Sequence, residues 1–183
     1  MKIQVIGLGL IGGSLCKALS RGGVHRVLGM DIDTETVRKA LISGAIQEEG
    51  TAATLKEADL AVVCLYPEGT IRFLLEHRED FKKGGIVCDV CGVKAAVVHA
   101  AAGPLREAGV RFVGCHPMAG REFSGFDYAR EDLFDGASFI LTPVEDTDPS
   151  AVAELAALAR SIGFGRAVTA PPEEHDRILA PTS

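Results

Sequence analysis

The sequence lacks an excess of basic residues. Lysine and arginine together number 19 against 25 aspartates and glutamates, which gives a formal net charge of −6 and a pI near 5.4. Proteins that bind nucleic acids or anionic membrane surfaces present a basic face. The composition therefore argues against both as partners, and a small anionic substrate would have to be held by a few local cations.

Long apolar runs and a secretory leader are also missing. No apolar stretch reaches the roughly 18 residues needed to span a bilayer. Met1 leads directly into a predicted strand, without the basic and apolar regions of a signal peptide. We therefore expect a cytoplasmic protein with no membrane partner.

Cysteines are few, and their number is odd. The five thiols, at positions 16, 64, 88, 91 and 115, fit reduced cysteines better than a disulfide framework. Cys88 and Cys91 have the C-x-x-C spacing of metal and redox sites, but no second pair accompanies them. We interpret them as small buried strand residues and predict no metal site.

Internal repeats, low-complexity tracts and interdomain linkers are absent, so the 183 residues predict one main domain, placed at residues 1–170. Strand-like and helix-like segments alternate, which is typical of a Rossmann-type α/β fold with a doubly wound, mainly parallel sheet. Strands are predicted at 2–6, 26–31, 45–47, 59–65, 86–89, 111–115, 138–142 and 166–169. Helices are predicted at 11–20, 34–41, 68–81, 94–108 with a break at Gly103-Pro104, and 150–162.

The most informative feature that is present is a glycine-rich turn after the first predicted strand. In its G-x-G-x-x-G pattern, Gly7 permits a tight turn, Gly9 lets the backbone approach a pyrophosphate, and Gly12 lets the next helix pack close to the strand. That helix would direct its free N–H groups and positive dipole end at the phosphates. The pattern predicts a dinucleotide site. Its predicted residues are Gly7, Leu8, Gly9, Leu10, Ile11, Gly12, Asp31, Leu65, Tyr66, Pro67 and Val93.

Asp31 indicates which dinucleotide is bound. It lies 19 residues after Gly12, at the tip of the second predicted strand, where an acidic residue binds the ribose 2′-hydroxyl. Its carboxylate should repel a 2′-phosphate, and Asp33 adds to that repulsion. We therefore expect NAD as the cofactor, with NADP disfavoured.

A second group of chemically capable residues follows the predicted strand 111–115. His116 opens the segment HPMAGREFSG at the carboxyl end of that strand, where loops carry the chemistry in this fold. A histidine there can face the nicotinamide ring and act as a base near neutral pH. A structural loop histidine is the alternative interpretation.

Three stretches of the sequence resemble the prephenate/arogenate dehydrogenases of tyrosine biosynthesis. They are residues 5–14 (VIGLGLIGGS), residues 116–125 with the pattern H-P-M-A-G-x-E-x-S-G, and the run EEHD at 173–176. The likeness spans the whole chain and implies NAD(P)-dependent oxidative decarboxylation of prephenate or arogenate. In that reaction hydride leaves the ring carbon bearing the hydroxyl, carbon dioxide departs, and the ring becomes a phenol.

The resemblance also implies roles for single residues. His116 matches the catalytic histidine that takes the proton of the 4-hydroxyl, which suits a pKa near the reference value of about 6.5. Glu122 matches a glutamate in the substrate pocket, and Lys94 with Arg121 would supply positive charge near the substrate. A solvated loop carboxylate and a surface lysine are the alternatives for Glu122 and Lys94. Gly92 stands where the family usually has a serine that contacts the substrate hydroxyl, which implies a weaker network or a water there.

In this family a helical domain follows, which forms the homodimer, closes the active site and supplies a substrate-binding arginine. Residues 171–183 match the start of the connection to it, and His175 is expected in interdomain packing. We therefore expect the chain alone to bind cofactor and to turn over substrate weakly or not at all. A β-hydroxyacid or imine reductase, and a non-catalytic NAD-binding module, are the alternative functions.

Overall fold

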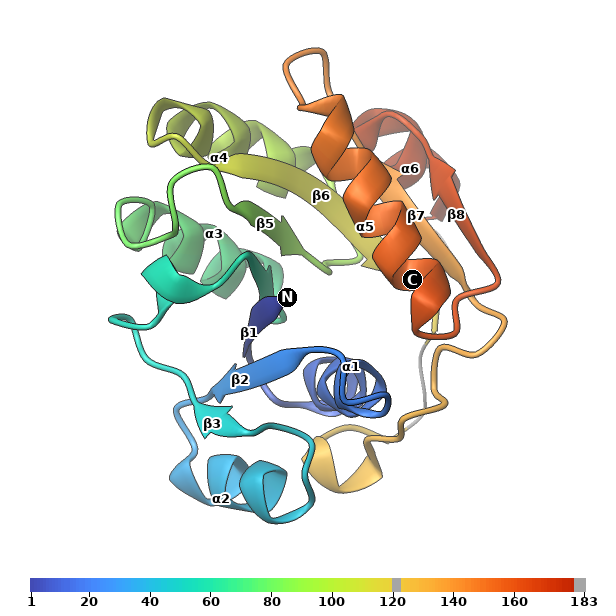
Figure 1. The fold of residues 1–183 in the computed structure, drawn as a ribbon. Coiled ribbons are helices and arrows are strands. Elements are labelled where there is room, and N and C mark those ends of the chain that lie inside the picture. Colours follow the sequence, from blue (N-terminus) through green and yellow to red (C-terminus); the bar gives the residue numbers. More distant parts are fainter. Residues whose placement is uncertain (120–122, 180–183) are drawn as a thin grey trace.

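An eight-stranded sheet with helices on both faces forms the body of the computed structural model, which describes residues 1–119 and 123–179 (Figure 1). The strands are β1 Lys2–Ile6, β2 Arg26–Met30, β3 Glu48–Glu49, β4 Leu60–Val63, β5 Ile86–Asp89, β6 Arg111–Pro117, β7 Ser138–Thr142 and β8 Arg166–Thr169. The helices are α1 Leu10–Ser20, α2 Thr34–Ile42, α3 Pro67–Glu76, α4 Ala95–Glu107, α5 Pro149–Ser161 and α6 Pro172–Leu179, with short 3₁₀ turns η1 Leu55–Glu57 and η2 Phe126–Tyr128. Within the described residues, no helix is long and apolar enough to cross a bilayer.

The strand order is β3-β2-β1-β4-β5-β6-β7-β8, and β6 and β7 form the antiparallel pair in an otherwise parallel sheet. The chain order reverses between β1 and β4, so a crevice opens at the carboxyl ends of these two strands. The predicted Rossmann-type α/β fold is thereby confirmed.

Each face of the sheet buries its own apolar core, as expected for parallel strands covered on both sides. On one face, Leu15 of α1 and Leu155 of α5 join the same buried cluster. On the other, Leu74 of α3 packs in a cluster with Val97 and Leu105 of α4. These two layers hold the carboxyl ends of β1, β4, β5 and β6 along one edge of the sheet, where the site is built.

Helix α4 differs from the sequence prediction because it is not interrupted at Gly103-Pro104. It runs continuously from Ala95 to Glu107 through Pro104. A proline lacks one N–H but keeps its carbonyl, and the Pro104 carbonyl accepts a hydrogen bond from the Ala108 N–H at 3.1 Å. The helix therefore continues past Pro104 and ends at Glu107.

Four strands differ from their predicted bounds. Of these, β2 ends at Met30 instead of residue 31, and β4 covers Leu60–Val63 instead of 59–65. β3 lies at Glu48–Glu49, after the predicted 45–47, because its pairing with β2 begins only at Leu28 and Glu48. β6 continues to Pro117, because β7 pairs with it and places His116 opposite Ile140. His116 therefore lies within β6, near its carboxyl end, rather than in the loop that follows.

Candidate active site

The glycine turn is constrained at two positions and open at the third. Gly7 has a φ of +93°, which L side chains rarely adopt, and a Cβ at Gly12 would lie 1.8 Å from the Gly7 carbonyl oxygen. A Cβ at Gly9, in contrast, would meet nothing within 4 Å. Helix α1 begins directly after Gly9 without a side-chain cap. The turn thus leaves room for a ligand in front of the N–H groups that begin the helix.

A cleft of about 940 Å³ opens at this turn. Its lining includes ten of the eleven residues predicted for the cofactor, and Val93 lies outside the described lining. The cleft is also lined by Cys64, Arg72 and Phe123, which no sequence motif singled out. Their contribution depends on how α3 and the 123–125 segment fold toward the turn, and no local pattern encodes it.

Asp31 is fixed at the rim of the cleft by backbone groups. Its Oδ2 accepts from the Leu8 N–H at 2.8 Å and its Oδ1 from the Asp33 N–H at 2.9 Å. Asp33 caps α2, because its side chain accepts a hydrogen bond from the Glu35 N–H. Hydrogen bonds to Asp33, first from the Thr36 hydroxyl, hold the pKa of this carboxyl below its usual range. Two carboxylates therefore lie near the position predicted for the ribose.

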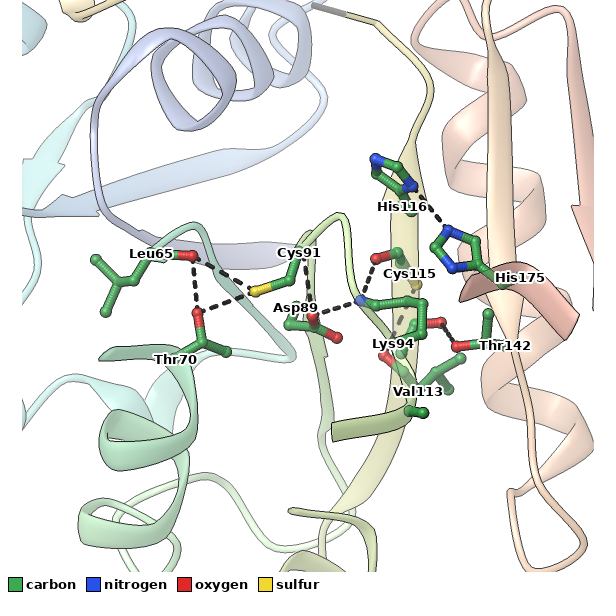
Figure 2. Close-up of polar contacts among 12 residues, drawn as sticks. Leu65, Thr70, Asp89, Cys91, Lys94, Val113, Cys115, His116, Thr142 and His175 are labelled. Atoms are coloured by element: carbon green, nitrogen blue, oxygen red, sulfur yellow. Dashed lines mark hydrogen bonds and ion pairs between the residues drawn. The ribbon is translucent and has the colours of Figure 1, made fainter. Parts of the chain in front are cut away.

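Lys94 lies in the interior, so the alternative interpretation as a surface lysine is wrong, while its role near the substrate stays a prediction. The side chain is fully buried. Its ammonium donates to Asp89 Oδ2 and to the Cys115 carbonyl, at 2.5 Å from the latter (Figure 2). The start of α4 lies over the carboxyl ends of β5 and β6, so a long side chain there points beneath the loop instead of into the cleft.

The buried ion pair braces the loop that contains Gly92. Asp89 Oδ2 also accepts from the Cys91 N–H at 3.0 Å, and Lys94 reaches the residue preceding His116. One ion pair therefore ties the 90–93 loop to β6. It fixes the distance between Gly92, which lines the cleft, and the predicted base.

His116 lies behind Gly92 with its Nε2 toward it. A Cβ at Gly92 would be 3.7 Å from His116 Nε2. Burial first, then the charges of His175 and Lys94, lower the pKa of His116 to about 4, while Asp176 opposes the shift. The ring is therefore neutral at physiological pH, and the expected pKa near the reference value is wrong.

The sequence suggested that His175 packs against another domain, but its position in the structure leaves it unavailable for such a contact. Its side chain is fully buried within this domain, and its Nε2 lies 2.8 Å from His116 Nδ1 (Figure 2). Helix α6 carries it there by packing on α4. The resemblance singled out both histidines but not their contact, because the two rings lie 59 residues apart in the sequence.

Glu122 and Arg121 lie outside the described residues, so their predicted roles have no structural account here. Ala119 and Phe123 on either side of them line the cleft.

The cysteine thiols lack the surroundings of reactive groups. Burial raises the pKa of the Cys91 thiol to about 11 and raises that of Cys16 further. Thiolates are the reactive form of cysteine, so burial disfavours the reactive form of these two thiols at neutral pH.

Comparison with known proteins places this geometry in a family. The family model described as prephenate dehydrogenase, nucleotide-binding domain, matches residues 15–167. Prephenate dehydrogenase from Bacillus subtilis is 36% identical over 186 residues, which cover 97% of this chain and 48% of that protein. The chain thus spans about half the length of that curated relative.

Solved structures agree over nearly the whole chain. The prephenate dehydrogenase from A. aeolicus, in complex with hydroxyphenyl propionate and NAD+, superposes with a TM-score of 0.90 at 28% identity and covers 98% of this chain and 63% of that one. Synechocystis arogenate dehydrogenase gives a TM-score of 0.88 at 34% identity, with 98% and 63% coverage. The chain therefore belongs to the nucleotide-binding domain family of the prephenate dehydrogenases.

Proposed function

We propose that the chain binds NAD in the cleft and supplies His116 as the base for oxidative decarboxylation of prephenate or arogenate. The observation that carries this proposal is the position of His116 Nε2 beside Gly92, a residue that lines the cleft beginning at the glycine turn. Relatives with these substrates in their names support the reaction class. Membership of this family argues against the β-hydroxyacid and imine reductase alternative.

The chain's own residues account for the proton in this reaction. Bound NAD supplies the hydride acceptor. His116 Nε2 takes the proton of the ring hydroxyl as the C–H bond at that carbon breaks and a carbonyl forms. Loss of carbon dioxide then aromatises the ring, and the proton returns to the product oxygen. Because its pKa is about 4, His116 starts this cycle with a free lone pair.

The reaction is tested by single-turnover assays, in which the chain is in excess over prephenate or arogenate and NAD is present. We expect NADH to form in proportion to the substrate added, even if the rate is slow. Measurement at high protein concentration detects a rate that steady-state assays would miss. Absence of NADH with both substrates would contradict the proposed function.

NAD is proposed over NADP because of Asp31. Replacing Asp31 with serine should weaken NAD binding roughly tenfold or more, since a hydrogen bond to a charged group contributes about 1.5–3 kcal/mol. The same change should narrow the preference over NADP, because the repulsion of a 2′-phosphate is removed. Calorimetric titration with both dinucleotides measures the two effects.

Asp80→Ser serves as the control, because it removes an equal charge from an exposed position outside the described cleft lining. Tighter binding of NADP than NAD by the unmodified chain would contradict the role given to Asp31.

Substitution of Gly92 tests the effect of the serine hydroxyl that the family usually has at this position. Its backbone is outside the left-handed region, and an added Cβ finds only ordinary contacts with His116. Gly92→Ser should therefore fold normally and raise single-turnover NADH formation by about two- to tenfold, the worth of one net hydrogen bond of about 0.5–1.5 kcal/mol. Gly92→Ala fills the same space without a hydroxyl, so an equal gain in both variants would refute this explanation.

A further inference from the structure

A chain of polar groups extends from His116 away from the cleft. His116 Nδ1 lies 2.8 Å from His175 Nε2, and His175 Nδ1 lies 2.8 Å from Asp176 Oδ1. The two rings meet edge to face, with centroids 5.0 Å apart and an interplanar angle of 71°. In Figure 2, His175 points from α6 directly at His116 on β6. The base is therefore backed by a second imidazole and a carboxylate.

Asp176 is held as an anion by the start of α4. Its Oδ1 accepts from the Lys94 N–H at 2.8 Å and its Oδ2 from the Ala95 N–H at 3.0 Å. Burial alone would raise the pKa of Asp176, but these N–H groups and the His175 ring together lower it. The N-terminus of a helix also favours a negative charge. Asp176 is therefore ionised at neutral pH and can only accept hydrogen bonds.

An ionised Asp176 determines where the protons of both rings lie. His175 must donate from Nδ1 to this carboxylate, so a neutral His175 has its lone pair on Nε2. His116 must then donate from Nδ1 to His175 Nε2. The remaining nitrogen of His116, Nε2, is left without a proton on the side that faces Gly92.

We infer that His175 and Asp176 are positioning residues for His116, which hold it in the tautomer with a free Nε2 and take up positive charge when that nitrogen is protonated. The inference rests on the proposed function for the meaning of the proton transfer, but not for the tautomer. As the Nε2–H bond forms on His116, its Nδ1–H proton shifts to His175 Nε2. His116 then remains neutral, and the imidazolium is His175, next to Asp176.

The charges around the two rings favour this transfer. Lys94, at the start of α4, disfavours a cation on His116 even though Asp89 of β5 is paired with it. Asp176 on α6 lies next to His175 and offsets a cation there. Protonation of His116 is unfavourable in its buried site. Transfer of the positive charge to His175 therefore makes His116 a better proton acceptor.

The tautomer can be measured without turnover, by long-range ¹H–¹⁵N correlation spectra of the 183-residue chain with ¹⁵N-labelled histidine near neutral pH. We expect both His116 and His175 to carry their proton on Nδ1. Asp176→Asn should weaken the Nδ1–H preference of both rings. The Lys94 N–H also points at the Oδ1 position, so the amide oxygen takes that place, and it is a weaker acceptor than a carboxylate. A proton on His116 Nε2 in the unmodified chain would overturn the inference.

A second variant covers the possibility that Asp176→Asn unfolds the helix start. His175→Phe keeps a ring of similar volume in the buried position but removes the acceptor, so His116 should lose its preference for the Nδ1–H form. His99→Phe is the matched control, because His99 contacts α6 through the exposed Glu173 and lies outside the chain of groups. An unchanged His116 tautomer in His175→Phe would overturn the inference.

The rate of single-turnover NADH formation tests whether these positioning residues affect the reaction. Asp176→Asn should lower this rate by roughly tenfold or more with unchanged NAD affinity, since a neutral amide does not offset the positive charge that forms on His175. An unchanged rate would show that Asp176 does not assist the proton transfer and would overturn the inference. If the unmodified chain forms no NADH, the proposed function fails, and the spectra still judge the tautomer separately.

Discussion

His116→Asn is expected to lower single-turnover NADH formation by about 100- to 10,000-fold, the usual contribution of a positioned general base. Asparagine can accept a hydrogen bond at this position but cannot take a proton. NAD affinity should stay unchanged, because His116 lies behind Gly92 and outside the described lining of the cleft. Stopped-flow absorbance of NADH and calorimetric titration with NAD measure the two quantities.

His99→Asn is the control for this change, since His99 lies on exposed α4 surface and contacts Glu173 rather than the cleft. A rate for His116→Asn equal to that of the control would exclude His116 as the base. A parallel loss of NAD affinity would instead show that His116 shapes the cofactor site, and this would also contradict its assigned role.

Lys94→Met should lower the free energy of unfolding by about 3–5 kcal/mol, the range for breaking a buried ion pair by removing one partner. Methionine nearly matches the length of lysine, so the loss comes from charge rather than volume. Asp89 would be left buried with one fewer donor, and its Oδ1 already has no hydrogen-bond partner in the described residues. Urea denaturation followed by circular dichroism measures the change.

Lys83→Met is a closely matched control. Lys83 also contacts one carboxylate, that of Glu79, and one carbonyl, that of Ala108, but its side chain is 60% exposed. Exposed ion pairs contribute about 0–1 kcal/mol. Equal destabilisation by the two substitutions would show that burial of the Lys94 pair has no special effect.

The fold was largely predictable from the sequence because its signals are local. The strands 86–89, 138–142 and 166–169 have their predicted bounds, since short apolar or β-branched runs between turn residues suffice to mark them. The glycine turn is predictable for the same reason. The break predicted at Pro104 failed because packing against the sheet held the helix together, and that contribution is tertiary.

The groups around the base were less predictable, because they depend on long-range packing. Lys94 lies two residues after Gly92, and its sequence context fits a position on the surface as well as one near the substrate. Its burial depends on β6 lying next to β5. His175 reaches His116 only because α6 docks on α4. A weak signal existed in the sequence, since His175 follows Pro172 by three residues, the spacing of one helix face, and both are buried.

The position of α6 makes proton transfer at His116 depend on the stability of one edge of the sheet. β8, which precedes α6, is an edge strand with mostly exposed side chains. Such margins open by local unfolding at a lower free energy than the centre of a sheet. Each opening would carry His175 and Asp176 away from His116 while the glycine turn stayed folded. Amide hydrogen exchange at α6 should therefore report how often the base is competent, independently of whether cofactor can bind.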